Sequence, residues 1–343
     1  MTVHHVLFGT YTRQSSKGIY EADFNDATGQ LSEPRLVFEA TNPTYLAISK
    51  ANKVYSVEKR GDEAGVLALD NATRPMTELG INLTEGSAPA YIGIDEDRQF
   101  VFAGYYHRGM VEVFKIEGDG SLTLQDTWYN HGKGPRPEQD AAHVHFTNLT
   151  PDNRLVVVDL GTDEVITLDL DDQGAMTEVA RYQTEAGFGP RHIRFSPDGQ
   201  YAYLLGELSS LLSVLKYDAD TGSFAHIMTI STIPTDWDDH NGAAAIRVSS
   251  DGRFIYTSNR GHDSVSVFQT SNFGSEIELI QTIDIEGSFP RDMNFDPAEK
   301  FLVVANQKTN NVSVFARDTE TGELELVQKD FPIPESVRVT FEN

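Results

Sequence analysis

The stretch Phe254-Ile-Tyr-Thr-Ser-Asn-Arg-Gly-His-Asp-Ser-Val-Ser-Val-Phe268 contains two apolar runs separated by a polar break that includes a glycine. Both runs are short and rich in β-branched and aromatic residues, which is typical of buried β-strands. The same phrase recurs at Tyr201–Leu215 and at Phe301–Phe315. Weaker copies begin at Val6, Val54, Phe100 and Leu155. The seven copies are spaced by roughly 46 to 55 residues, a period that indicates a repeat architecture.

Turn residues surround the copies. A tight turn precedes two of them at Pro197-Asp-Gly199 and Ser250-Asp-Gly252, and another turn follows at Asp220-Thr-Gly222. Asp, Asn and Gly supply the backbone geometry that joins antiparallel strands. Each copy with its flanks therefore predicts four antiparallel strands. Helical periodicity is absent, so a doubly wound α/β fold lacks the helices it would need.

Four antiparallel strands repeated seven times are typical of a β-propeller. We therefore predict an all-β, seven-bladed propeller that forms one domain over residues 1–343, although length alone favours about two domains. The segment Val337–Phe341 is predicted to be the first strand of the blade whose second strand begins at Val6. The N- and C-terminal strands then share one blade and close the ring, which removes two free edges.

The chain of 343 residues carries 27 Lys and Arg against 52 Asp and Glu, a net charge of −25. Nucleic acids and anionic membranes would repel such a chain, so we expect neither partner. The chain has no cysteine, which excludes disulfides, a thiolate nucleophile and thiolate metal ligands. It shows no signal-peptide pattern and no long apolar run, so we expect a cytoplasmic protein, as a monomer or weak homo-oligomer.

In a propeller, the start of each blade's first strand and the end of its second strand lie at one mouth of the central channel. Consecutive blades place polar residues there in an ordered way: His145, then Arg191 with Glu207, then Arg260, then Arg291 with Gln307. Three arginines gathered in an acidic chain predict a local anion site, and the His and the carboxylate form a candidate acid-base pair. Each residue alone has a structural explanation, so the interpretation rests on their convergence.

Other residues carry weaker signals. His143 lies two residues from His145 on the same side of its strand, so we expect it to face the channel as well. The segment Asp236-Trp-Asp-Asp-His240 is interpreted as a solvated loop, and no metal site is predicted. The fingerprints of serine hydrolases, zincins, P-loop proteins and Rossmann enzymes are absent from the sequence.

Several short motifs also occur together in a known family. They are Gly189-Pro-Arg-His-Ile-Arg-Phe195, Gly206-Glu-Leu208, Ser258-Asn-Arg-Gly261, Phe289-Pro-Arg291 and Ala305-Asn-Gln-Lys308. As a set, over essentially the whole chain, they resemble the motifs of the propeller-type 6-phosphogluconolactonases, a lactonase family that includes fungal carboxymuconate cycloisomerases. The resemblance implies a seven-bladed propeller without metal or cofactor. It also implies hydrolysis of 6-phosphoglucono-1,5-lactone in the pentose phosphate pathway, so the expected partner is a small anionic sugar lactone.

Carried over residue by residue, the resemblance implies the following catalytic set: His145, Arg191, Glu207 and Arg260. We expect the substrate-binding set to be Arg291, Gln307, His143 and His192. Either His145 or Glu207 would take the proton of the attacking water, and an arginine would stabilise the oxyanion. We place Arg191 and Arg260 near the reacting carboxyl group and Arg291 toward the phosphate.

Two alternatives remain open at this point. The first is another sugar-acid lactonase or a carboxymuconate-type cycloisomerase, because members of the family differ in substrate. The second is a non-catalytic propeller scaffold that binds other molecules, because a fold alone does not determine a function.

Overall fold

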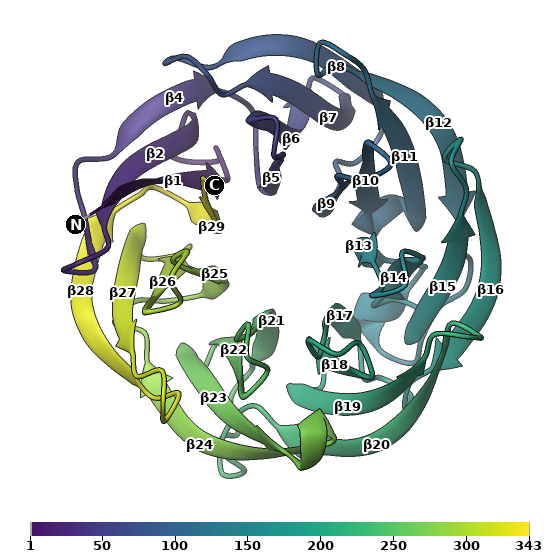
Figure 1. The fold of residues 1–343 in the computed structure, drawn as a ribbon, viewed down its shortest axis with the longest axis vertical. Coiled ribbons are helices and arrows are strands. Elements are labelled where there is room, and N and C mark those ends of the chain that lie inside the picture. The colour runs from purple at the N-terminus through teal and green to yellow at the C-terminus, as the bar shows by residue number, and fades with distance from the viewer. Residues whose placement is uncertain (1, 343) are drawn as a thin grey trace. The chain divides into compact units, whose positions relative to one another are not determined.

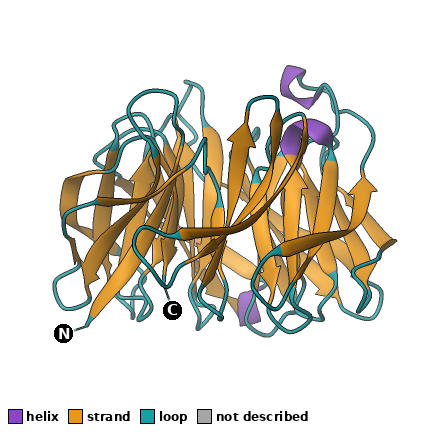
Figure 2. Cartoon of the chain, turned by 90° about the horizontal axis from the view of Figure 1, so that it is seen from above, coloured by secondary structure: helices purple, strands orange, loops and turns teal. Residues whose placement is uncertain are grey.

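Residues 2–342, which the computed structural model describes, fold into seven antiparallel sheets. The chain divides into two compact units. The middle unit is built from Tyr45–Ser209 and Ser213–Met228, and the terminal unit from the residues up to Thr44, Ser210–Leu212 and the residues from Thr229 onward. Strands make up nearly all of the regular structure (Figure 2). The described helices are three short 3₁₀ segments, η1 (Tyr106–Arg108), η2 (Pro137–Gln139) and η3 (Asn272–Gly274). No described helix is both long and apolar enough to span a membrane.

The middle unit contains four sheets of four strands each, apart from the few residues of the last sheet that group with the terminal unit. The strands are β5 (Leu46–Ile48), β6 (Lys53–Arg60), β7 (Glu63–Asp70), β8 (Thr77–Glu85); β9 (Tyr91–Asp95), β10 (Phe100–Tyr105), β11 (Met110–Ile116), β12 (Leu122–Tyr129); β13 (Val144–Leu149), β14 (Leu155–Asp159), β15 (Glu164–Leu170), β16 (Met176–Gln183); and β17 (Pro190–Phe195), β18 (Tyr201–Gly206), β19 (Leu211–Asp218), β20 (Ser223–Ser231).

The terminal unit contains three sheets. Their strands are β29 (Ser336–Phe341), β1 (Val3–Thr10), β2 (Gly18–Asn25), β3 (Gln30–Leu31), β4 (Arg35–Glu39); β21 (Gly242–Val248), β22 (Phe254–Arg260), β23 (Ser264–Ser271), β24 (Glu276–Asp284); and β25 (Pro290–Phe295), β26 (Phe301–Asn306), β27 (Asn311–Arg317), β28 (Leu324–Pro332).

The terminal strands pair as the sequence predicts. In Figure 1 the purple strand β1 lies beside the yellow strand β29, with Val6 opposite Phe341 and Phe8 opposite Val339. Both strands therefore belong to one sheet. The outer strand of this sheet differs from the expected four-strand pattern, because it is split into β3 and β4, which both pair with β2. Pro34 lies in the break, where its missing N–H would interrupt a continuous ladder.

The repeated phrase correctly predicts where most of the second strands begin. Five of them, β10, β14, β18, β22 and β26, begin at the residues where the repeated phrase begins: Phe100, Leu155, Tyr201, Phe254 and Phe301. Nearly every residue of these strands is buried, and each strand begins with an apolar run that does not alternate with polar residues. The outer strands, such as β16, alternate exposed and half-buried residues instead.

The core lies between neighbouring sheets within each unit. In the middle unit, Phe102 and Val113 of one sheet pack in the same cluster as Val157 and Ile166 of the next. In the terminal unit, a corresponding cluster joins the sheet β21–β24 to the sheet β25–β28. Sheet-on-sheet packing of this kind leaves the strand ends and their loops to carry polar residues.

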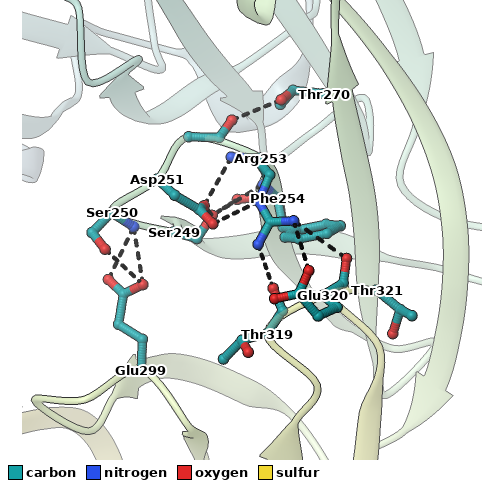
Figure 3. Close-up of polar contacts among 12 residues, drawn as sticks. Ser249, Ser250, Asp251, Arg253, Phe254, Thr270, Glu299, Thr319, Glu320 and Thr321 are labelled. Atoms are coloured by element: carbon teal, nitrogen blue, oxygen red, sulfur yellow. Dashed lines mark hydrogen bonds and ion pairs between the residues drawn. The ribbon is translucent and has the colours of Figure 1, made fainter.

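The turn at Ser249–Arg253 shows how the predicted Ser-Asp-Gly turns are built (Figure 3). The Ser249 hydroxyl and the Arg253 backbone N–H donate to the same oxygen of Asp251, at 2.6 and 3.0 Å. The Arg253 guanidinium donates to the other Asp251 oxygen at 2.7 Å and to the carbonyl of Thr319 at 2.6 Å. Burial alone would raise the pKa of Asp251, but these hydrogen bonds outweigh it and lower the pKa to about 2.

Candidate active site

The middle unit brings five of the predicted site residues together. They are His143, His145, Arg191, His192 and Glu207. His145 comes from β13, Arg191 and His192 come from β17, and Glu207 directly follows β18. Four of the five are nearly fully buried, and only the Glu207 side chain keeps appreciable exposure, at 20%.

A β-bulge aims each first-strand residue at the site. In β13, Val144 pairs with Asp159 and Phe146 with Val158, so His145 is the extra residue of the bulge. In β17, Pro190 pairs with Gly206 and His192 with Leu205, so Arg191 occupies the same position. A bulge re-aims a side chain out of the regular alternation, and bulges are common beside active sites.

The hairpin that carries Glu207 depends on a close backbone approach. The backbone N–H of Glu207 donates to the carbonyl of Gly189 at 2.7 Å. Gly189 has a left-handed backbone, with φ of +60°, and a Cβ at this position would lie 2.4 Å from the Leu208 side chain. Glycine is therefore required here. Asp163 secures the loop, because its carboxylate accepts the backbone N–H of Gly189 at 2.8 Å.

One carboxylate oxygen links the charged residues. Oε2 of Glu207 lies 2.8 Å from Nε of Arg191, at ion-pair distance. The same oxygen lies 4.0 Å from Nε2 of His145, which is too long for a direct hydrogen bond. A single water or a substrate hydroxyl fits between two polar groups at such a separation. The three side chains thus combine a cation, a carboxylate and an imidazole around one point.

Aromatic rings surround His145. The ring of His192 lies 5.2 Å from it and the ring of Tyr106 lies 5.6 Å from it, both in edge-to-face arrangements. His192 is also in contact with Phe146, and its Nε2 lies 3.4 Å from Nη1 of Arg191. These contacts hold the imidazole of His145 in a fixed orientation. His192 thus packs against both His145 and Arg191, and its expected contact with a substrate stays a prediction.

His143 uses both edges of its ring within the protein. Its Nδ1 lies 3.0 Å from the carbonyl oxygen of Tyr106, and its Nε2 lies 2.9 Å from a carboxylate oxygen of Asp140. The ring stacks on Tyr106 at 4.3 Å with an interplanar angle of 6°. These contacts fix Tyr106 against His145, and the expected contact of His143 with a substrate stays a prediction.

Tyr106 is a site residue to which the sequence assigns no role. Burial, and after it the negative charge of Glu207, raises the pKa of Tyr106 to about 12. Its phenol therefore keeps its proton at neutral pH and remains a hydrogen-bond donor. The signal in the sequence was its position at the end of a second strand, equivalent to Glu207 in another repeat.

Asp159 organises the backbone behind His145. Its Oδ1 accepts the backbone N–H groups of His143, Gly161 and Thr162, at 2.7, 2.9 and 3.1 Å. Its Oδ2 accepts the side-chain amide of Asn130 at 2.9 Å. Burial outweighs these bonds and raises the pKa of Asp159. The sequence gives no indication of this role, which depends on the turn that follows β14.

The terminal unit carries the other three predicted site residues. Arg260 ends β22 and is 6% exposed, and its Nε donates to the carbonyl of Gly242 at 3.0 Å. Arg291 is the extra residue of a bulge in β25, since Pro290 pairs with Asn306 and Asp292 with Ala305. Gln307 directly follows β26.

A group of possible metal ligands also lies in the terminal unit. His5, Glu21 and Asp23 bring their ligand atoms within 4.8 Å of one another. Arg35 donates to Glu21 at 2.7 Å and to Asp23 at 2.6 Å. The guanidinium already compensates both carboxylates, so the group is explained as an ion-pair network.

Comparisons with known proteins agree with this architecture. Residues 5–341 match the family described as "Lactonase, 7-bladed beta-propeller". The seven sheets correspond in number to the blades of that family. An uncharacterized protein of Lactococcus lactis subsp. cremoris is 46% identical over 96% of this chain and 97% of its own length.

Two further relatives extend the comparison. A Bacillus subtilis protein named 6-phosphogluconolactonase is 40% identical over 99% of both chains. The crystal structure of a protein from Lactobacillus plantarum superposes with a TM-score of 0.98 over 100% of both chains, at 48% identity. Of these three relatives, the Bacillus subtilis protein is the one whose name states an activity.

Proposed function

The chain belongs to the lactonase family of seven-bladed β-propellers, and from that premise we propose that it hydrolyses 6-phosphoglucono-1,5-lactone to 6-phosphogluconate. The observation that carries the proposal is the Glu207 oxygen 2.8 Å from Arg191 and 4.0 Å from His145. This arrangement offers a base, a carboxylate and a cation to one reacting carbonyl group. The named Bacillus subtilis relative supports the choice of substrate.

His145 serves as the general base. Imidazole changes its charge between about pH 5 and pH 8, so it can take and return a proton near neutrality. The Glu207 carboxylate is held by Arg191 and faces the imidazole, so its charge stabilises the imidazolium that forms. A positioned general base contributes roughly 10²–10⁴ in rate.

The reaction then proceeds in two steps. The oxygen of a water molecule attacks the lactone carbonyl carbon while Nε2 of His145 takes one of the water protons, and the carbonyl oxygen becomes an oxyanion. The guanidinium of Arg191 stabilises that oxyanion, at about 10²–10³ in rate for one good donor. The bond between the carbonyl carbon and the ring oxygen then breaks, and the ring oxygen takes the proton from His145. The acid product loses its remaining proton to solvent.

A hydrolysis assay tests the proposal. Purified protein is added to freshly prepared 6-phosphoglucono-1,5-lactone in strong buffer, and the rate is compared with spontaneous hydrolysis. We expect a clear acceleration that Glu207→Gln reduces at least a hundredfold. Glu178→Gln is the matched control, because Glu178 also pairs with an arginine, Arg181, at 2.9 Å in the same unit, but on its surface.

The outcomes separate the alternatives. A rate equal to the spontaneous one would overturn the proposal. Equal turnover of the phosphate-free gluconolactone would indicate a general sugar-acid lactonase, and turnover of a carboxylated muconolactone would indicate a cycloisomerase. A chain that hydrolyses none of these substrates would support a binding scaffold.

A further inference from the structure

The ring of Phe289 in the terminal unit is shared by two cations. Nζ of Lys308 lies 4.1 Å from the ring centroid, and the guanidinium carbon of Arg260 lies 5.2 Å from it. Aromatic faces attract cations, and contacts of this length are favourable. The ring therefore holds two positive charges near each other.

The ring of Tyr11 is shared by two more cations. The guanidinium carbon of Arg13 lies 3.9 Å from its centroid, and that of Arg291 lies 5.4 Å from it. Arg291 is two residues from Phe289 in the chain, with Pro290 between them. Four cationic side chains are thus arranged around the tripeptide Phe289–Arg291. Because both cations on a ring lie within 5.4 Å of its centroid, like charges are brought close together, and a bound anion would reduce their repulsion.

Three of the four cations on these rings have no carboxylate partner within the described residues. Arg35 and Arg181 each meet two carboxylates. By contrast, no carboxylate oxygen of the described chain lies at ion-pair distance from Arg13, Arg291 or Lys308. Other cations, such as Lys59 and Lys216, also have no carboxylate at ion-pair distance within the described residues. What distinguishes Arg13, Arg291 and Lys308 is that they are held on the rings of Tyr11 and Phe289.

The backbone holds the tripeptide in a strained form. Phe289 has a φ of 67°, in the left-handed region that bulky residues rarely adopt. The Asp263 carboxylate accepts its N–H at 2.8 Å, and its carbonyl accepts the N–H of Gln307 at 3.1 Å. The N–H of Lys308 donates to the carbonyl of Ser288 at 3.1 Å. Strain of this kind persists where the surroundings enforce it, and it is concentrated at functional sites.

The loop that carries Arg13 is fixed in a similar way. The Glu335 side chain accepts four successive backbone N–H groups, from Arg13, Gln14, Ser15 and Ser16, at 2.9 to 3.2 Å. Glu335 is 4% exposed. Its carboxylate thus binds the main chain of the loop, and the Arg13 guanidinium is directed onto Tyr11.

Gln307 adds a polar group beside the cations. Its side-chain oxygen is buried and has no hydrogen-bond partner within the part of the chain that the structure describes. The amide can present either its oxygen or its NH₂ group to a ligand. An anion with hydroxyl groups nearby would satisfy both kinds of contact.

We propose that Arg13, Arg291 and Lys308, held on Tyr11 and Phe289, form a binding site for the phosphate group of a phosphorylated sugar. A phosphate monoester carries close to two negative charges and three acceptor oxygens, so it matches several cations better than a single carboxylate does. The choice of a sugar as the carrier rests on the proposed lactonase function. The anion site rests on the contacts described above.

Isothermal titration calorimetry on the full chain, without any lactone, tests the proposal. The probes are glucose 6-phosphate, inorganic phosphate, and glucose and gluconate as phosphate-free controls. We expect glucose 6-phosphate to bind more tightly than inorganic phosphate, and the two phosphate-free controls not to bind. Lys308→Met and Arg13→Met are each expected to weaken binding about tenfold, and the double variant to abolish it. Lys308→Arg keeps the charge and is expected to keep binding.

Lys329→Met is the matched control, because Lys329 is an exposed lysine of the same unit that pairs with Glu286 at 3.1 Å. It removes the same charge and is expected to leave Kd unchanged. Equal losses in Lys329→Met and Lys308→Met, or no phosphate binding by the wild-type chain, would overturn the proposal. Equally tight binding of gluconate would also overturn it. Because no turnover is measured, a chain that binds glucose 6-phosphate but hydrolyses no lactone would contradict the proposed function alone.

Discussion

In the middle unit Arg191 meets a carboxylate, whereas in the terminal unit Arg291 meets an aromatic ring. Both arginines are the extra residue of a β-bulge in a first strand, and both follow a proline. Their backbone environments are therefore equivalent. The difference lies in what neighbouring strands supply. Around Arg191 the site mixes a cation, a carboxylate and an imidazole, which suits proton transfer. Around Arg291 it gathers cations on rings, which suits the binding of a negative charge.

Equivalent positions of the repeated backbone can therefore place an arginine beside a carboxylate or on an aromatic ring. The bulge aims a side chain, and the end of the next strand decides its partner. Glu207 follows β18, and Gln307 with Lys308 follows β26, at equivalent positions of two sheets. Substitutions confined to one unit should therefore affect the chemistry or the stability of that unit.

Removing the imidazole should have the largest effect. His145→Ala is expected to lower kcat for lactone hydrolysis by about 10²–10⁴, because the water proton then has no positioned acceptor. The measurement is the enzymatic rate above the spontaneous rate in strong buffer. His226→Ala, at an exposed position of β20, is the control. Retention of most activity in His145→Ala would remove His145 from the mechanism.

Neutralising Asp292, a buried carboxylate of the terminal unit that forms ion pairs with two arginines, should destabilise the fold. Asp292 accepts hydrogen bonds from Arg247 at 3.0 Å and Arg338 at 2.9 Å. Burial alone would raise the pKa of Asp292, but the two arginines outweigh it and hold the pKa below its ordinary value. Asp292→Asn is expected to lower the free energy of unfolding at pH 7 by about 3 kcal/mol, because two buried cations lose their partner.

The pH dependence of the same variant follows from the sign of the shift. A carboxyl group with a lowered folded pKa contributes stability above the unfolded value, near 3.9, and that contribution is lost as the pH falls through the folded pKa. Asp292→Asn should therefore show a shallower loss of stability below about pH 4. Denaturant unfolding at several pH values measures both effects, with the exposed Asp172→Asn as control. Identical acid profiles in wild type and variant would contradict the assignment.

Loosening the support of His145 should have a moderate effect. His143→Gln removes the stack on Tyr106 and is expected to lower kcat about tenfold with little change in KM, because the substrate still binds but the base is less well oriented. His143→Phe keeps the stack and should recover part of the loss. A change confined to KM would instead indicate that His143 contacts the substrate.

Removing one ring from the cation pairs should have the smallest effect. Phe289→Leu is expected to raise the Kd for glucose 6-phosphate about threefold, since it deletes the cation–π contacts but keeps the charges. Phe273→Leu is a matched control, because Phe273 also has a left-handed backbone, with φ of 59°, and is 89% exposed. Calorimetric titration of both variants gives the comparison, and equal Kd values would show that the ring does not position the cations.

The repeat predicts the sheets almost to the residue, because buried strands and their turns leave direct signals in composition. Tyr201 and Phe254, for example, begin both a repeated phrase and a strand. The same alignment placed His145, Arg191 and Glu207 at strand ends of neighbouring repeats, and the structure brings these three side chains together. The bulges were not predicted, since a one-residue register shift changes no residue type. Pro190 and Pro290 are the available signals, because proline within a strand is often found at a bulge.

Support from outside the first strands was also missed. Tyr106 and Asp140 reach His143 through a 3₁₀ turn and a loop, whose conformations depend on contacts distant in sequence. The same holds for Tyr11 and Arg291, which are 280 positions apart in the chain yet in ring contact. Such side-chain partners depend on which strands lie side by side in the folded protein. A short sequence motif does not contain that information.

The pairing of β1 with β29 has a consequence for biosynthesis. Strand β1 is synthesised well before its partner β29, because all the residues between Thr10 and Ser336 separate them in the chain. Until β29 has been synthesised, the edge of β1 that will pair with it has no hydrogen-bonding partner. That edge can then pair with a strand of another chain. A gene rearranged so that Ser336–Phe341 directly precedes Val3 would shorten this interval, and because the two strands already lie side by side, such a permuted chain should reach the same sheet.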